Sequence, residues 1–467
     1  MKTIIITLNK KIALFVLLTS VSILSQSCED FVAVDLPTNQ LTGATVFEDV
    51  TTADAAMTHV YSRMRDVVLV TGTSDGLSCL LGNYSDEFDY YSTGGLSAEY
   101  FYQNNLLPTT PSITTLWNST YELIYAVNSV IEGVTTSGGI SVADKERLLG
   151  EAYFVRAYLH FYLVNLYGEI PYVLTTDYEI NTNISKLSIP DVYAAMTTDL
   201  QQAVSLMPEA YSSFDRIRPN RSVGYALLSR IKLYSEHWNE ALLYADMVLA
   251  NSALYQMESD LNQVFLNSST GTLWQLLPQF SGSNTLEAQS FIFSSGPPPS
   301  FALTDAFINS FAIGDMRKNL WIGTVTDGSQ NWYYPNKYKE QAPTGSSVEY
   351  SILFRIEELY LIRAEAKAQL GDLDGAKQDL NLLRNRAGLA DTAALTTTAL
   401  LAAIQDERRF EFFTELGHRW FDLKRTGTAT SVLGVLKPGW DSKDLLLPLP
   451  SGELLLNPNL LPQNAGY

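Results

Sequence analysis

The sequence predicts a mostly α-helical protein in which paired helices form a scaffold around one long irregular insertion. Three observations lead to this prediction. Apolar residues recur at helical spacing in several long stretches, and two of these stretches resemble each other as repeats do. The segment between the two is rich in Gly, Pro, Ser and aromatic residues. A chain of 467 residues that is 46% hydrophobic can bury a large core, which is typical of a globular protein.

Four helices are expected in the first half of the chain. Apolar residues recur there every three or four positions, as they do on the buried face of a helix. Gly168 and Pro171 end the third helix, while Pro190 and Pro208 mark the two ends of the fourth. We therefore expect helices over residues 52–70, 114–134, 145–167 and 189–207. Residues 71–111, which contain many Gly, Ser, Asn and Tyr, are expected to form loops.

The internal repeat predicts two helical hairpins. When residues 222–250 are aligned with residues 357–388, three positions match: Tyr225 with Tyr360, Ser229 with Ala364, and Ala241 with Ala376. A small residue in each helix of a pair allows close approach, and this spacing is tetratricopeptide-like. Gly371 and Asp372 supply the turn of the second copy. Further hairpin members are expected at residues 151–167 and 400–421, giving a short stack of about four pairs.

Residues 252–355 interrupt this helical pattern. The run Pro297–Pro299 cannot lie inside a helix. Short strand-like runs occur at residues 272–277 and 290–293. Because long loops on a rigid scaffold tend to carry function, this insertion is predicted to form the binding face.

The N-terminus has the pattern of an export signal. Lys2, Lys10 and Lys11 precede an apolar run at residues 12–24, which is too short to span a bilayer. Small residues and then Cys28 follow, which resembles a lipoprotein signal in which that cysteine is lipidated. The alternative is an ordinary secretory signal followed by an incidental cysteine. Cys79 is the only other cysteine, so acylation of Cys28 would leave no internal disulfide.

The charge balance excludes one class of partner and favours another. Lys and Arg number 31 against 50 Asp and Glu, so the net charge is −19 and binding to nucleic acid is not expected. Charged residues make up only 17% of the chain, whereas 26 residues are Tyr. Such a surface suits a neutral ligand rich in hydroxyl groups.

No enzyme signature dominates the sequence. The 4 His residues are far apart, and no metal-binding, P-loop or nucleophile-elbow motif occurs, so neither a cofactor nor a metal is expected. Asp86, Glu87 and Asp89 form an acidic cluster that leaves a glycosidase as an alternative. The carboxylates at residues 407–425, including Glu415 beside Arg419, are instead interpreted as a structural network between helices.

Two polar segments have the composition of a sugar-binding surface. An aromatic ring covers the apolar face of a pyranose, while Asn, Asp and Gln side chains bind its hydroxyl groups. The candidates in these segments are Asp86, Tyr90, Tyr91, Tyr102, Asn104, Trp321, Trp332 and Tyr334. Trp117, Trp274 and Trp420 lie in apolar or helical contexts and are expected in the core.

Three stretches near the C-terminus carry the motifs of a known family. They are RIEELYLIRAEA at 355–366, ERRFEF at 407–412, and LPLP at 447–450 with Glu453 and a terminal QNAGY. On these motifs the chain resembles the SusD/RagB family of Bacteroidetes outer-membrane lipoproteins. It departs slightly at Leu449, where the family has Ile, and at Ala465, where the family has Pro. The N-terminal signal also agrees, as do Leu116 and Trp117 with Tyr121 and Asn128, and the stretch Arg156–Tyr158. The resemblance therefore covers nearly the whole mature chain.

This resemblance implies a receptor, not an enzyme. Such proteins capture glycans at the cell surface beside a TonB-dependent outer-membrane transporter of the SusC type, and some capture peptides instead. It also implies a lipid anchor in the outer membrane, and the acidic residues after Cys28 resemble a signal for its outer face. We therefore expect a signal peptide at 1–27, a tether at 28–50, a helical region at 51–251, a ligand-binding insertion at 252–355 and a second helical region at 356–467.

Overall fold

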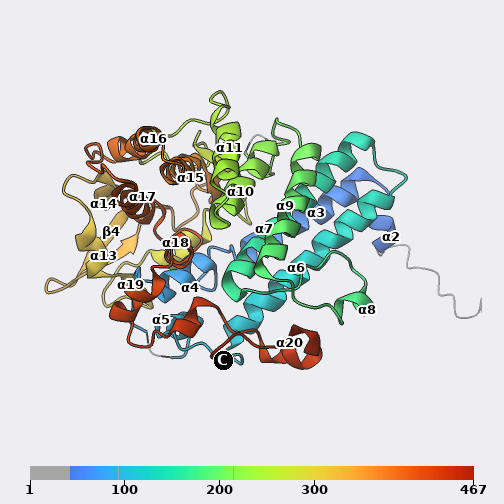
Figure 1. The fold of residues 1–467 in the computed structure, drawn as a ribbon, viewed down its shortest axis with the longest axis horizontal. Coiled ribbons are helices and arrows are strands. Elements are labelled where there is room, and N and C mark those ends of the chain that lie inside the picture. Colours follow the sequence, from blue (N-terminus) through green and yellow to red (C-terminus); the bar gives the residue numbers. More distant parts are fainter. Residues whose placement is uncertain (1–42, 93, 214) are drawn as a thin grey trace, which may run out of the picture. The chain divides into compact units, whose positions relative to one another are not determined.

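The computed structural model describes residues 43–92, 94–213 and 215–467, of which residues 47–467 form one compact unit (Figure 1). Helices predominate in it, as the sequence predicts. The expected signal peptide, Cys28 and most of the expected tether lie outside the described residues. Inside the expected tether, α2 (Gly43–Val46) is helical and Phe47 is buried. The division of the compact unit at residues 251 and 355 stays a prediction.

The four helices expected in the first half are present within a few residues of their predicted ends. They lie side by side in Figure 1, where α7 packs between α6 and α9. Ser141 and Ser188 cap α7 and α9 by accepting backbone N–H groups, and Gly168 ends α7 with a φ of 80°. The helices are α3 (Val50–Asp66), α6 (Pro111–Thr136), α7 (Val142–Tyr167) and α9 (Ile189–Leu206).

The two predicted hairpins form and stack on each other. They are α10 (Arg221–Tyr234) with α11 (Trp238–Leu249), and α15 (Ile356–Gln369) with α16 (Leu373–Arg386). The small residues allow the expected close approach, because the Ser229 hydroxyl donates to the Ala241 carbonyl over 2.9 Å. Ala364 and Ala376 are buried together in the second hairpin. Since α11 also packs on α15, the tetratricopeptide-like arrangement is confirmed.

Two of the sequence-based expectations for the helices are wrong. Residues 71–111 contain α4 (Leu77–Tyr84) and α5 (Ser97–Tyr102) in addition to loops. Every residue of α4 is buried, so the helix has no polar face that would mark its period in the sequence. The helix expected over residues 400–421 is two helices, α17 (Thr397–Phe412) and α18 (His418–Arg425), because the chain turns through Gly417 at a φ of 75°.

The insertion contributes five of the six strands found in the described residues. A four-stranded antiparallel sheet has the order β1 (Phe88–Tyr90), β3 (Phe301–Leu303), β5 (Asn331–Pro335) and β4 (Ile322–Thr326). β2 (Thr272–Leu276) pairs with β6 (Ser351–Arg355), which confirms the first predicted strand. The second predicted strand is wrong, since residues 290 and 291 end α12 (Leu286–Phe291), which Thr285 caps, and residues 292 and 293 follow it without regular structure. Two short helices, α13 (Asp305–Ser310) and α14 (Met316–Leu320), complete the insertion.

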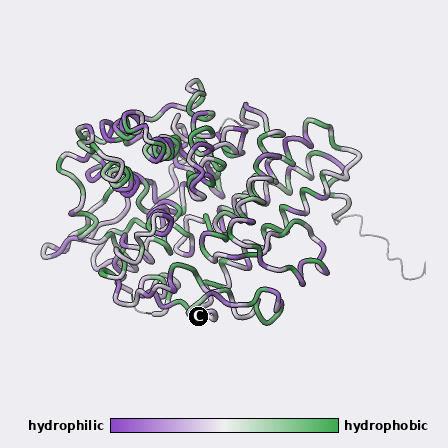
Figure 2. Tube along the Cα trace, in the orientation of Figure 1, coloured by the Kyte–Doolittle hydropathy of each residue, from purple (hydrophilic) through white to green (hydrophobic). Residues whose placement is uncertain are grey.

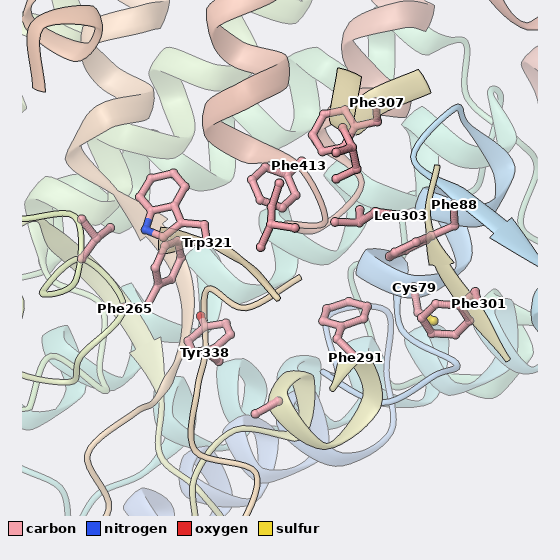
Figure 3. Close-up of a cluster of buried hydrophobic side chains, with 14 of the residues drawn as sticks. Cys79, Phe88, Phe265, Phe291, Phe301, Leu303, Phe307, Trp321, Tyr338 and Phe413 are labelled. Carbon is pink, nitrogen blue, oxygen red and sulfur yellow. The ribbon is translucent and has the colours of Figure 1, made fainter. Parts of the chain in front are cut away.

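The four-stranded sheet separates two groups of side chains. Phe88, Phe301 and Leu303 point into a large aromatic cluster with Phe307 and Phe413, which Figure 3 shows. The alternating positions place Ala302, Trp332 and Tyr334 on the opposite face, where Phe293 covers part of the sheet. One face of the sheet therefore packs on the large cluster, and the other carries a smaller buried cluster.

A buried ionic network ties the insertion to the C-terminal helices. The Glu411 carboxylate lies 3.0 Å from Arg317 and 2.5 Å from both Arg355 and Arg386. This agrees with the structural interpretation of residues 407–425. The expected partner of one residue is wrong, however: Glu415 pairs with Lys337 and Arg355, whereas Arg419 pairs with Asp86.

The chain ends in a series of short elements. They are α19 (Ala429–Leu436), a 3-10 turn at Ser442–Leu445, α20 (Ser451–Leu456) and a 3-10 turn at Pro458–Leu460. Figure 2 shows that α20 is largely hydrophobic, yet none of its residues is buried.

Candidate ligand-binding site

Two of the predicted ligand-binding tryptophans are core residues. Trp321 is 0% exposed, packs on Phe265, and donates its indole N–H to the Leu261 carbonyl over 3.0 Å (Figure 3). Trp332 is 5% exposed and lies against Gly296, where an added Cβ would fall 1.9 Å from its ring. Both residues are therefore corrected to packing positions, because neither presents a ring face to solvent. Trp117, Trp274 and Trp420 are buried as predicted.

Two predicted polar contacts are also occupied within the protein. The Asp86 carboxylate is buried and accepts hydrogen bonds from Arg409 over 3.0 Å and from Arg419 over 2.7 Å. Asn104 is buried, and its side-chain amide donates to the Tyr84 carbonyl over 3.3 Å. These assignments are corrected too, since the side chains hold the loops in place and do not face a ligand.

The remaining four candidates are at least partly accessible. Tyr90 and Tyr102 come from β1 and α5, and their rings stack with centroids 6.0 Å apart. Tyr91 follows β1, is 37% exposed, and donates its backbone N–H to the Ser300 carbonyl. Together these three residues form what we call the tyrosine ledge. Tyr334 lies two strands away on β5, where its ring covers Gly323.

Charged groups adjoin the tyrosine ledge. Burial and the nearby Asp305 carboxylate raise the pKa of Asp89, while Lys437 and the Tyr102 hydroxyl oppose that shift. The Lys437 amine lies 4.0 Å from the centroid of the Tyr102 ring and donates to the Asn83 carbonyl over 2.7 Å. Burial lowers the pKa of Lys437 to about 8. The ledge thus combines flat rings with hydrogen-bonding groups, as recognition of a hydroxylated ring requires.

The acidic pair Asp86 and Glu87 has a different environment. Burial opposes ionisation of Asp86, but Arg419 and Arg409 outweigh it and lower its pKa. Glu87 accepts the Thr414 backbone N–H over 3.0 Å, and burial raises its pKa to about 7. Divergent pKa values are typical of an acid–base pair, but also of buried structural carboxylates. Since both side chains are covered, neither can reach a substrate in this structure.

The sequence did not single out Asp305 and Lys437. They lie far from the ledge along the chain, on α13 and at the end of α19, and neither belongs to a recognisable motif. A second feature was also missed. A cavity of about 440 Å³ lies between α6, residues 171–184 and α20, and its lining includes Trp117, Tyr125 and Glu453.

Two properties of the described residues bear on membranes and metals. Within residues 43–92, 94–213 and 215–467, no helix is both long and apolar enough to cross a bilayer. In the same part of the chain, no three His, Cys, Asp or Glu side chains are grouped as metal ligands would be.

Comparisons with known proteins agree with the fold. Residues 83–233 match a family described as "Starch-binding associating with outer membrane", and residues 321–467 match the SusD family. SusD-like protein P2 of Formosa agariphila is 27% identical, with the match covering 76% of this chain and 81% of that one. A SusD-like protein of Bacteroides ovatus is 23% identical over 66% of this chain and 64% of its own.

Solved structures show the same architecture. A SusD superfamily protein from Bacteroides vulgatus superposes with a TM-score of 0.79 at 22% identity, covering 90% of this chain and all of that one. A laminarin-binding SusD-like protein gives a TM-score of 0.75 at 21% identity, covering 89% of this chain and 99% of its own. With both family matches, the helical hairpins and the C-terminal motifs in agreement, this chain belongs to the SusD/RagB family.

Proposed function

We propose that this protein captures a glycan at the cell surface, without cleaving it, and delivers the glycan to a TonB-dependent transporter of the SusC type. Family membership supports this role, since one matched family is described as starch-binding and associated with the outer membrane. One structural relative is described as laminarin-binding, and another as a surface glycan-binding protein from Bacteroides thetaiotaomicron.

The observation that carries the proposal is the tyrosine ledge. Tyr91 and Tyr102 are accessible and lie beside Asp89, so a pyranose ring can stack on an aromatic face while its hydroxyl groups bind a carboxylate. This recognition needs no net charge on the ligand, which fits a neutral polymer. Tyr334 packs with Phe293 on the face of the sheet opposite to the one on which Tyr90 packs, so it stays a separate candidate contact.

The proposed location follows from the N-terminal sequence. Lipidation of Cys28 would tether the protein to the outer membrane, next to the transporter that receives the ligand. Peptide capture by the same architecture is the main alternative. A glycosidase is disfavoured because the Asp86 and Glu87 side chains are buried and, for Asp86, ion-paired.

Affinity electrophoresis against a polysaccharide panel that includes laminarin and starch tests the proposal. We expect at least one polymer to retard the native protein. Tyr91→Ala and Tyr102→Ala should each weaken that binding about tenfold, because each removes a stacking surface worth about 1–2 kcal/mol. Both variants should unfold at nearly the same denaturant concentration as the parent, since the two side chains are partly exposed.

Tyr244→Ala is the matched control. Tyr244 stacks on Tyr225 between α10 and α11 with ring centroids 6.0 Å apart. The substitution therefore removes a comparable tyrosine from the helical scaffold. Polymer binding should be unchanged in it. Retardation equal to the parent in both ledge variants would refute the site. Binding of peptides and of no polymer would favour the alternative, and release of reducing ends would establish an enzyme.

A further inference from the structure

The cavity beside α6 is a second candidate site, and none of its lining residues belongs to the tyrosine ledge. Its volume of about 440 Å³ lies in the range of small-molecule sites. Three segments form its walls: α6, residues 171–184 with the short helix α8 (Tyr178–Asn181), and the C-terminal stretch through α20. Residues from the two halves of the chain therefore meet in it.

Aromatic rings form the part of the wall that α6 contributes. Trp117, Tyr121 and Tyr125 follow one another at intervals of four on α6, so they share one face of the helix. Trp117 and Tyr121 lie with ring centroids 4.8 Å apart, and the Tyr121 hydroxyl donates to the Pro171 carbonyl over 2.8 Å, which fixes the inner rings. Tyr125 and Tyr178 are 52% and 72% exposed, so rings at the rim are open to an entering ligand.

The walls are joined by direct hydrogen bonds. The Asn457 and Asn459 amides donate to the carbonyls of Ile184 and Asn183, each over 2.8 Å. The Lys186 amine donates to the Pro462 carbonyl over 2.7 Å. These contacts hold the C-terminal segment against residues 183–186, so the cavity is largely formed before any ligand binds and little ordering cost remains.

The lining of the cavity includes one carboxylate, that of Glu453. Glu453 lines it and is half-buried, and burial alone raises the pKa of its carboxyl. Its charge also contributes, after burial and Tyr167, to the raised pKa of Tyr121, so the carboxylate lies near the inner rings. Across the described part of the chain, no basic side chain pairs with Glu453.

We propose that this cavity binds an organic ammonium group, carried by a small ligand such as an amino sugar or a basic amino acid. A cation is attracted to the faces of Trp and Tyr rings, and an ammonium donates hydrogen bonds to a carboxylate. Both kinds of partner line this cavity. A neutral ligand of the same shape would leave the Glu453 charge uncompensated, which is costly in a partly buried site.

Isothermal titration of the full protein with matched probes tests this proposal and separates the two ligand sources. D-glucosamine is compared with N-acetyl-D-glucosamine, which has the same ring without the positive charge. Nα-acetyl-L-lysine amide is compared with Nα-acetyl-L-norleucine amide, which is neutral because a hydrogen atom replaces the side-chain ammonium. We expect at least one ammonium probe to bind at least tenfold more tightly than its neutral counterpart. The ammonium probe that binds shows whether the ligand is an amino sugar or a basic amino acid.

Substitutions locate the binding. Glu453→Gln keeps the shape of the side chain and should weaken binding of the ammonium probe about tenfold. Tyr178→Ala, at a position so exposed that folding should not depend on it, should weaken binding several-fold. Glu146→Gln is the control, because it removes one negative charge from an exposed position on α7 outside the cavity. The ledge variants Tyr91→Ala and Tyr102→Ala should bind the probe normally.

Equal affinity for a charged probe and its neutral counterpart would overturn the proposal, as would the absence of binding by both ammonium probes at millimolar concentration. Unchanged binding in both Glu453→Gln and Tyr178→Ala would also overturn it, since the probe would then bind elsewhere. The titration does not depend on polymer capture. Its result therefore stands whether or not the tyrosine ledge binds a glycan.

Discussion

Two regions that adjoin in the sequence, the acidic pair Asp86–Glu87 and the tyrosine ledge, have opposite environments. Asp86 and Glu87 are buried and bound by the C-terminal helices, whereas Asp89 and Tyr91 are only partly covered and lie at a sheet edge. The contrast shows that a carboxylate among aromatic residues is not by itself a binding site. A carboxylate can bind a ligand only where its hydrogen-bonding capacity is not already used within the protein.

The largest effect on stability is expected at Asp86. Asp86→Asn removes the charge that pairs with both Arg409 and Arg419, whose side chains are 17% and 13% exposed. Leaving two mostly buried guanidinium groups without a counter-charge should lower the free energy of unfolding by about 3 kcal/mol. Urea denaturation measures this. A change below about 0.5 kcal/mol would mean that the ion pairs of Asp86 do not hold the loop. Asp86 would then not differ from the tyrosine ledge in its contribution to stability.

Glu87 should show its burial through pH. Its pKa in the folded protein is about 7, above the ordinary value of 4.5, so the folded state keeps a proton that the unfolded state loses as pH rises. The stability from this group is therefore present below pH 4.5 and lost between pH 4.5 and about 7. The loss should be on the order of 2–3 kcal/mol.

Glu87→Gln tests this pH dependence, because glutamine can still accept the Thr414 N–H but binds no proton. Unfolding free energies of parent and variant are measured at pH 5 and at pH 7.5. The parent should lose more stability than the variant over that interval. Parallel losses in the two proteins would show that Glu87 does not titrate in this window.

The smallest effect on stability, but a clear effect on binding, is expected at Asp89. Asp89→Asn removes a negative charge that the Asp305 carboxylate repels, so the unfolding free energy should change by less than about 1 kcal/mol. Polymer affinity should fall several-fold, because a charged acceptor beside the tyrosine ledge is lost. Affinity electrophoresis next to urea denaturation separates the two outcomes. A large loss of stability without loss of affinity would place Asp89 with the buried pair.

The limits of the sequence-based predictions follow from particular residues. Helices with one polar face, such as α9, were located within a few residues, because their periodicity records which face is buried. α4 was missed because the fold covers all its sides. Trp321 and Trp332 were assigned to the ligand because their neighbours are polar, but Phe265 and Leu261 cover Trp321, and the segment around Gly296 covers Trp332.

The sequence by itself determined the helical scaffold, the repeated hairpins and the family, since these depend on local periodicity, small-residue spacing and contiguous motifs. Only the tertiary structure decided which aromatic rings are free and which carboxylates are paired. Those properties depend on contacts such as Asp86 with Arg419, and Glu453 with the rings of α6, between residues hundreds of positions apart. Burial and charge compensation are set by what packs around a side chain, and no local pattern records that.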